Sequence, residues 1–201
     1  MVKVIRSISE NQHDILANII TLHTPTGFDC DPTYGKGNFY TDKRICKPSF
    51  VSDLYPREEG VLRCAAECLP LPDESKKSII FDPPFIVGFT TGKPAGIMGE
   101  RFGGFRYISD LWQWYTQCLH EFYRILEIDG TLVIKCQDTV SSGKQWLSHV
   151  YLIQEAEKLG FYAKDLFILT AKNRMIGHNH KNQKHARKFH CYFLVFVKRI
   201  K

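Results

Sequence analysis

Residues 78–85 read SIIFDPPF, which places an acid, two prolines and an aromatic ring directly after a short apolar run. Proline cannot donate a backbone hydrogen bond to a sheet, so the run predicts a buried strand that stops at Asp82. A carboxylate there could accept hydrogen bonds from a ligand, held in place by the rigid Pro83–Pro84 unit. Asp followed by Pro is also common turn chemistry. The stretch alone therefore leaves both a turn and a catalytic pocket open.

Two earlier stretches place further acids at the ends of expected strands. Residues 31–37 read DPTYGKG, and such glycines allow a ligand close to backbone N–H groups, which can bind a polar or anionic group. The spacing is neither GxGxxG nor GxxxxGKS/T, so it does not favour a standard dinucleotide or P-loop site. Asp53 follows the next expected strand, where an acid can accept hydrogen bonds from ribose hydroxyls. Ligands of open α/β sheets bind at this edge, which favours a site over three unrelated turns.

The elements around these residues alternate between helix-like and strand-like patterns. Helices are expected over 8–23, 109–126 and 143–160, with Ser9 and Ser109 as N-caps and Gly160 as a C-cap. Strands are expected at 78–82, 130–138, 164–172 and 191–199, with short ones before Asp31 and Asp53, while 61–65 is ambiguous. No helix separates the last two strands, which predicts an antiparallel hairpin. The pattern as a whole indicates an α/β domain with a mainly parallel sheet.

Length and composition indicate one globular domain over residues 1–201, with 44% hydrophobic and 24% charged residues. No apolar stretch approaches the roughly 20 residues of a membrane span, and the first residues lack the apolar core of a signal peptide. Seven irregularly spaced cysteines include no CxxC pair, which argues against a disulfide framework or a zinc site. We therefore expect a cytoplasmic protein with reduced thiols and no membrane association.

Positive charge and glycine gather in two expected loops. The net charge is +6, and residues 171–190 hold six Lys or Arg and four His but no acid, which indicates either a polyanionic partner or a solvated loop. Residues 86–106 include six glycines between Gly88 and Gly104, and we expect this loop to close over a substrate strand rather than to be simply disordered. The four histidines (His178, His180, His185, His190) have a spacing that could hold a metal, but no acid or cysteine lies among them, and no metal is expected.

In their order along the chain, these motifs resemble those of the class I S-adenosylmethionine-dependent amino-methyltransferases that act on nucleic acid bases. DPTYGKG resembles the cofactor loop that reads DPFxGSG in many DNA methyltransferases, and DPPF resembles their catalytic tetrapeptide. GTLVIKCQD and HCYFLVFVKR resemble the later strands of that fold. The resemblance covers roughly residues 10–199 and is closest to small phage-type DNA methyltransferases. It implies a Rossmann-like single domain, S-adenosylmethionine as cofactor and DNA as partner, in the host cytoplasm if the protein is phage-encoded.

The resemblance also assigns roles to residues. The Asp82 carboxylate and the Pro83 carbonyl would accept hydrogen bonds from the target amino group, Pro84 would fix the turn, and Phe85 would stack on a flipped base. The residues implied to bind the cofactor are Asp31, Pro32, Thr33, Gly35, Gly37, Asp53 and Glu67. The residues expected to contact phosphates are Lys93, Arg101, Arg106, Lys172, Arg174, Lys181, Lys184, Arg187 and Lys188.

Two departures from the family pattern keep alternatives open. Lys36 replaces a small residue of the cofactor loop, and the usual Asp is missing before the Leu-Pro ahead of the catalytic strand, so Glu67 or backbone groups would serve. A catalytically weak nucleic-acid-binding module of the same fold therefore remains an alternative. Asp at the first tetrapeptide position favours adenine N6 over cytosine N4. The leading hypothesis is a DNA adenine-N6 methyltransferase, and RNA or a protein nitrogen are the alternative acceptors.

Overall fold

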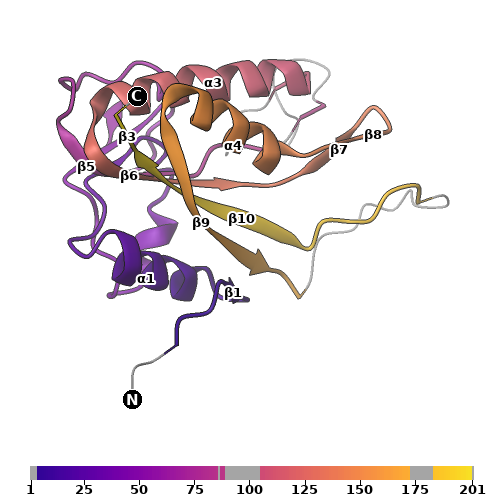
Figure 1. The fold of residues 1–201 in the computed structure, drawn as a ribbon, viewed down its shortest axis with the longest axis horizontal. Coiled ribbons are helices and arrows are strands. Elements are labelled where there is room, and N and C mark those ends of the chain that lie inside the picture. Colours follow the sequence, from indigo (N-terminus) through magenta and orange to yellow (C-terminus); the bar gives the residue numbers. More distant parts are fainter. Residues whose placement is uncertain (1–3, 86, 89–104, 173–182, 201) are drawn as a thin grey trace.

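The computed structural model of the chain describes residues 4–85, 87–88, 105–172 and 183–200. These residues build an eight-stranded sheet in the order β1-β9-β10-β6-β5-β2-β3-β4 (Figure 1). The strands are β1 (Ile8–Ser9), β2 (Cys30–Asp31), β3 (Phe50–Asp53), β4 (Leu62–Arg63), β5 (Lys76–Phe81), β6 (Leu126–Cys136), β9 (Phe161–Thr170) and β10 (His190–Lys198). Only β10 is antiparallel to its neighbours, β6 and β9. The expected mainly parallel sheet with a C-terminal antiparallel hairpin is confirmed.

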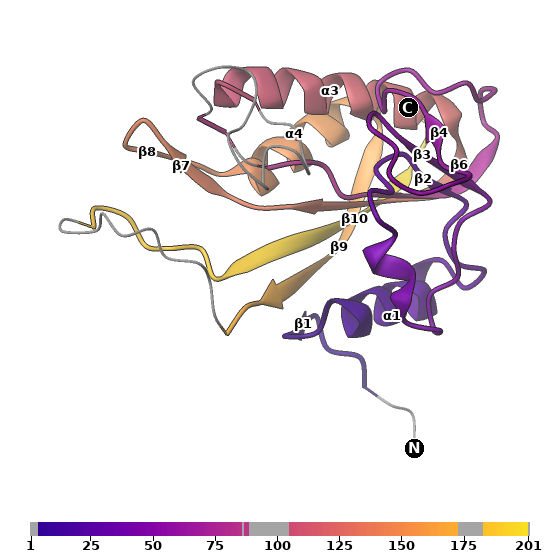
Figure 2. The same ribbon diagram turned by 180° about the vertical axis from the view of Figure 1, so that it is seen from behind.

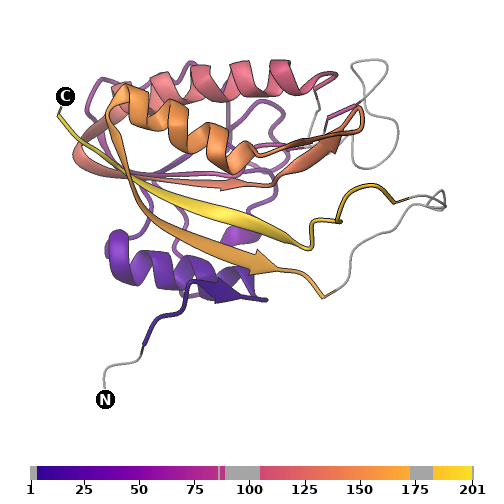
Figure 3. The same cartoon turned by 45° about the vertical axis from the view of Figure 1, so that its right-hand side comes forward.

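Helices cover both faces of this sheet. α1 (Gln12–His23) lies on one face, and α3 (Ile108–Ile125) and α4 (Ser148–Leu159) lie side by side on the other (Figure 3). Alternate residues of β5 serve the two cores, because successive strand side chains point to opposite faces: Phe81 packs in the core with α3 and α4, and Ile80 in the core with α1. None of the helices in the described part of the chain is long and apolar enough to cross a membrane.

The starts of two helices differ from the sequence prediction. The N-cap of α1 is Asn11, whose Oδ1 accepts a hydrogen bond from the backbone N–H of His13 at 2.9 Å, and the prediction of Ser9 as N-cap was wrong. Ser9 instead lies in β1, which pairs in parallel with β9. α3 starts one residue before Ser109, with Tyr107 at the N-cap position. Capping patterns depend only on neighbouring residues, so they did not predict that the segment before α1 pairs with β9, which is distant in the sequence.

The predicted helix over 143–160 was wrong in its first residues. A second sheet occupies that place, formed by the hairpin of β7 (Thr139–Ser141) and β8 (Lys144–Trp146). Ser142 and Gly143 form its two-residue turn with φ of 52° and 72°, as tight hairpin turns require. Gly160 ends α4 at a φ of 110°, as predicted. The β7–β8 hairpin extends toward the same side of the molecule as the open ends of β9 and β10 (Figure 2).

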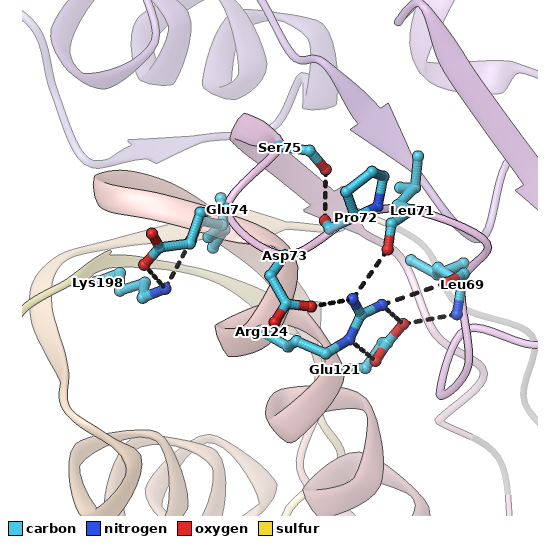
Figure 4. A network of polar contacts seen from close by, with 10 residues as sticks. Leu69, Leu71, Pro72, Asp73, Glu74, Ser75, Glu121, Arg124 and Lys198 are labelled. Atoms are coloured by element: carbon cyan, nitrogen blue, oxygen red, sulfur yellow. Dashed lines mark hydrogen bonds and ion pairs between the residues drawn. The ribbon is translucent and has the colours of Figure 1, made fainter.

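A polar network fixes the segment that leads into β5 (Figure 4). Arg124 of α3 donates to Glu121 and Asp73, both at 2.6 Å, and to the backbone carbonyls of Leu71 at 2.9 Å and Leu69 at 3.3 Å. Glu121 in turn accepts a hydrogen bond from the backbone N–H of Leu69 at 2.7 Å. Four hydrogen bonds therefore tie residues 69–73 to α3, and β5 enters the sheet from an anchored position.

Candidate active site

The three acids that sequence analysis singled out lie at one edge of the sheet. β2, β3 and β5 run parallel, so Asp31, Asp53 and Asp82 meet where these strands end. The backbone N–H of Asp82 donates to Thr33 Oγ1 at 2.8 Å, and the backbone N–H of Gly35 donates to Asp53 Oδ2 at 2.9 Å. The loop after β2 is thus bonded both to the turn after β3 and to the turn after β5.

Asp31 is the buried centre of this loop. Only 2% of it is exposed, and its carboxylate accepts hydrogen bonds from the Tyr40 hydroxyl at 2.6 Å and the Thr33 backbone N–H at 2.9 Å. Burial raises the pKa of Asp31 to about 7; the Tyr40 and Thr33 hydrogen bonds oppose this rise, and the charge of Asp82 adds to it. Its hydrogen-bond partners are neutral and none of the described cations pairs with it, so a cationic ligand would stabilise the ionised form.

Glycine is required at the end of the same loop. Gly37 has a φ of +67°, and a Cβ there would lie 2.5 Å from the Tyr34 hydroxyl. The Tyr34 ring stacks on Tyr40 with centroids 5.4 Å apart. Pro32 is buried, whereas Lys36 is exposed, so the departure at Lys36 does not fill the loop. The positive φ and the nearby Tyr34 hydroxyl therefore both favour glycine at position 37.

Asp53 and Glu67 are already engaged within the protein. Asp53 Oδ1 accepts from the backbone N–H of Tyr55 at 2.8 Å in addition to the bond from Gly35, and each oxygen retains a further lone pair. Glu67 Oε2 accepts from the indole N–H of Trp114 in α3 at 2.8 Å. The hydrogen bond from Gly35 links Asp53 to the loop after β2, but no such bond within the described residues links Glu67 to it.

The DPPF tetrapeptide is fixed at both ends. Thr33 holds the Asp82 backbone, and the hydroxyl of the fully buried Tyr115 donates to the Pro84 carbonyl at 3.3 Å. Within the described part of the chain, no donor reaches the Pro83 carbonyl. The Asp82 side chain is 28% exposed, so it remains accessible to a ligand. The turn therefore holds a partly exposed carboxylate next to the carbonyl of the buried Pro83, on a backbone that two prolines restrict.

Lys135 is a candidate site residue that sequence analysis missed. β5 and β6 pair with Phe81 opposite Ile134, so the next residues, Asp82 and Lys135, are also neighbours. Lys135 Nζ lies 3.0 Å from Asp82 Oδ2 and donates to Gln12 Oε1 at 2.9 Å. The available signal was a single charged residue within the apolar run TLVIKC.

A pocket of about 650 Å³ opens beside this pair. Phe85 and Lys135 line it, together with Gln12 at the start of α1 and the open ends of β9 and β10. Its other lining residues are Glu10, Gln137, Leu169, Thr170, Ala171, Lys172, Lys188, Phe189, His190 and Cys191. This volume lies in the usual range for small-molecule sites, roughly 300–1,000 Å³. The candidate catalytic turn therefore borders a cavity large enough for a nucleotide.

The residues expected to contact phosphates are only partly described. Lys93, Arg101, Arg174 and Lys181, and the histidines His178 and His180, lie outside the described residues. Arg106, Lys172 and Lys184 are exposed, and Arg187 and Lys188 are half-buried. Lys172 pairs with Glu10 at 2.8 Å, and both line the pocket; His185 Nε2 lies 2.8 Å from the Gly143 carbonyl of the β7–β8 hairpin. No cluster of three metal-ligating side chains occurs among the residues the structure describes.

The expected loop over 86–106 is described only at its two ends. Val87 and Phe105 form an isolated parallel bridge, and the backbone N–H of Gly88 donates to the Phe105 carbonyl at 3.0 Å. These contacts bring the two ends of the segment together next to Phe85. Its proposed closure over a substrate strand stays a prediction.

Comparison with solved structures shows which known proteins have a similar fold. A protein of Bacillus halodurans assigned as a methyltransferase is 12% identical, with 92% of this chain and 99% of that chain covered and a TM-score of 0.54. TrmN from Thermus thermophilus is 15% identical, with 94% and 50% covered and a TM-score of 0.52. A Thermus thermophilus protein assigned as a DNA modification methylase, crystallised with S-adenosyl-L-methionine, is 19% identical, with 66% and 51% covered and a TM-score of 0.45.

The first solved structures that match are about twice as long as the matched part, since the chain spans 48% to 51% of their length. The search of curated proteins gives no match. The model of the N6/N4 methyltransferase family, described as DNA methylase, matches residues 77–201, which is more than half of the chain and includes the DPPF turn, Lys135 and the C-terminal hairpin. The chain therefore belongs to the N6/N4 DNA methylase family.

Proposed function

We propose that this chain transfers a methyl group from S-adenosylmethionine to the exocyclic N6 amino group of adenine in DNA. The observation that carries this proposal is the DPPF turn, which is bonded through Thr33 to the loop after β2 and borders the 650 Å³ pocket. Membership of the N6/N4 family supports methyl transfer to an amino group of a DNA base. The preference for adenine over cytosine rests on Asp82 at the first tetrapeptide position.

The loop after β2 fits the methyl donor of the family. S-adenosylmethionine carries a sulfonium and an ammonium charge, and Asp31 is a carboxyl whose hydrogen-bond partners are neutral and whose burial raises its pKa to about 7. Asp53 keeps lone pairs that can accept from ribose hydroxyls. The bound cofactor would supply an electrophilic methyl group. We propose that it is held by Asp31, Pro32, Thr33, Gly35, Gly37, Asp53 and Glu67.

The DPPF turn can make the acceptor nitrogen a better nucleophile, because it offers hydrogen-bond acceptors for the amino hydrogens. The lone pair of an exocyclic amino group is delocalised into the ring, so the nitrogen is a poor nucleophile. Asp82 Oδ1 and the Pro83 carbonyl, neither of which has a donor among the described residues, can each accept one amino hydrogen and so localise the lone pair. The Asp82 carboxylate then stabilises the positive charge that develops on the nitrogen.

The pocket supplies the place for the base. A base inside a duplex must be flipped out to reach such a site, and Phe85 on the pocket wall offers a ring on which it can stack. Stacking on an aromatic side chain is worth about 1–3 kcal/mol per base. Cationic residues near the mouth, among them Lys172 and Lys188, would neutralise flanking phosphates.

Methyl transfer is tested directly with labelled S-adenosylmethionine and, separately, duplex DNA, single-stranded DNA and RNA. Mass spectrometry of the digested nucleosides distinguishes N6-methyladenine from N4-methylcytosine, and Asp82→Ala is the control. We expect N6-methyladenine in DNA with the wild type and none with the variant. Transfer only to RNA, or transfer that survives Asp82→Ala, would contradict the proposal.

Calorimetric titration with S-adenosylmethionine separates the remaining alternatives. Cofactor binding without transfer to any nucleic acid would point to a protein or small-molecule acceptor. Absence of cofactor binding would leave a nucleic-acid-binding module. The N4 product in place of the N6 product would leave the mechanism intact and correct only the identity of the base.

A further inference from the structure

A second charged group, Lys135, lines the pocket and contacts the candidate catalytic carboxylate of Asp82. Lys135 Nζ lies 3.0 Å from Asp82 Oδ2, and the side chains are 14% and 28% exposed. The DPPF tetrapeptide does not contain this residue, which comes from β6. Pairing a lysine in a largely buried place costs desolvation that an apolar residue of the same length would avoid. A role beyond packing would explain why a charge lies here.

The position of the ammonium group is defined by three elements of the fold. Gln12 at the start of α1 accepts from Nζ at 2.9 Å, and the rings of Phe39 and Phe193 lie with their centroids 5.2 Å and 5.8 Å from it. A lysine ammonium has three N–H donors, of which Asp82 and Gln12 use two. The side chain also lines the pocket, so the third N–H can serve a ligand there.

The pair offers an acceptor and a donor side by side. Adenine presents its amino donor next to the N1 acceptor, and cytosine presents its amino donor next to the N3 acceptor. Guanine and thymine present the reverse order, a carbonyl acceptor next to an N–H donor. Asp82 and Lys135 therefore match the edges of adenine and cytosine, whereas guanine or thymine would face like groups and leave buried polar atoms unpaired.

We propose that Lys135 donates a hydrogen bond to the ring nitrogen adjacent to the methylated amino group, so that Asp82 and Lys135 together select the target base. This inference rests on the proposed function and adds to it a specificity-determining residue outside the DPPF turn. Lys135 also occupies Asp82 Oδ2, which leaves Oδ1 for the amino group. The ion pair thus fixes the orientation of the carboxylate.

The test combines a change in the enzyme with a change in the base. A DNA duplex carries either adenine or 1-deazaadenine, which has C–H in place of N1, at a position that the wild type methylates. The enzymes are the wild type, Lys135→Met, which keeps the length without the charge, and Lys135→Arg, which keeps a donor. If the methylated base is cytosine, 3-deazacytosine takes the place of 1-deazaadenine.

We expect the wild type to lose about tenfold to a hundredfold in kcat/KM on the deaza base, the usual effect of removing a hydrogen bond to a charged group. Lys135→Met should be low on adenine and lose no more than twofold further on the deaza base, while Lys135→Arg should regain part of the discrimination. The inference would be overturned if the wild type had the same kcat/KM on both bases. It would also be overturned if Lys135→Met lost as much kcat/KM on the deaza base as the wild type does.

The design separates this inference from the proposed function. A wild type that methylates no DNA base would refute the proposed function itself, whereas a wild type that methylates both bases equally would refute only the role of Lys135. Calorimetric titration with S-adenosylmethionine shows whether Lys135→Met is folded. If it does not fold, the wild-type comparison of the two bases still decides.

Discussion

Asp31→Asn is expected to remove most of the pH dependence of cofactor binding. Asp31 is 2% exposed, its hydrogen-bond partners are neutral, and burial raises its pKa to about 7. A cationic cofactor in the loop after β2 would favour the ionised carboxylate and lower that pKa. Binding below pH 7 must then release a proton, so affinity should rise with pH.

The size of the effect follows from the pKa. A carboxyl with a pKa of about 7 is ionised to roughly one tenth at pH 6 and nine tenths at pH 8. If the complex holds it fully ionised, the Kd falls about tenfold over this range. The stability of the free protein depends on pH in the opposite sense. The pKa of Asp31 in the folded protein lies above its ordinary value of 3.8, so the stability that Asp31 contributes is fully present below about pH 4 and is lost as the pH rises to about 7.

Calorimetric titration with S-adenosylmethionine at pH 6, 7 and 8, in buffers of different ionisation enthalpy, gives the Kd and the number of protons released. The amino group of the cofactor titrates near pH 8 and contributes equally to both proteins, so the difference between wild type and Asp31→Asn isolates the carboxyl. Asp53→Asn is the matched control and should keep the pH dependence. The same tenfold change and proton release in Asp31→Asn would refute the reasoning.

Three further substitutions test the parts that position the site. Thr33→Val removes the acceptor for the Asp82 backbone N–H, and we expect about 1 kcal/mol lower stability in urea and at least tenfold slower methyl transfer; Thr33→Ser keeps the hydroxyl and should remain near wild type. Gly37→Ala brings a Cβ to 2.5 Å from a tyrosine hydroxyl at a φ of +67° and should weaken cofactor binding about tenfold by calorimetry, whereas Gly60→Ala, at a φ of +75° with open space, should leave binding unchanged. Arg124→Met removes the network that anchors the segment before β5 and should cost about 1–3 kcal/mol in urea unfolding, since the side chain is 35% exposed; an unshifted midpoint would show that the network does not contribute.

Local chemistry explains which elements the sequence predicted well. β5 could be predicted because an apolar run ends at two prolines, and the C-terminus of α4 because Gly160 takes a positive φ. The start of α4 could not be predicted in this way. Trp146 fits an apolar helical pattern, but tertiary contacts place it in a strand. Its ring packs edge-on against Trp112 of α3 with centroids 5.3 Å apart, as part of β8.

Lys135 was missed because its contact with Asp82 depends on how two strands align, which sequence analysis could not predict. The ends of parallel strands meet at one edge whatever their register, so the acids at strand ends could be grouped in advance. The contact of Lys135 with Asp82, 53 positions apart, depends on the register of β5 and β6, which shifts between Lys76 and Ser78. A sequence pattern contains no information on that shift, so a lysine in an apolar strand cannot be assigned to its partner.

One run of contacts joins the two candidate subsites. Tyr40 donates to Asp31, Asp31 accepts from Thr33, the Thr33 hydroxyl accepts from the Asp82 backbone, and the Asp82 carboxylate pairs with Lys135. Because the hydroxyl of Thr33 in the loop after β2 accepts from the Asp82 backbone, a shift of that loop would either break this hydrogen bond or move the backbone of Asp82. A change in the charge of Asp31 would also alter the hydroxyl of Thr33, 3.4 Å away, since linked hydrogen bonds polarise one another. The geometry therefore gives ligand binding at the loop after β2 a direct physical route to the position of the candidate catalytic carboxylate.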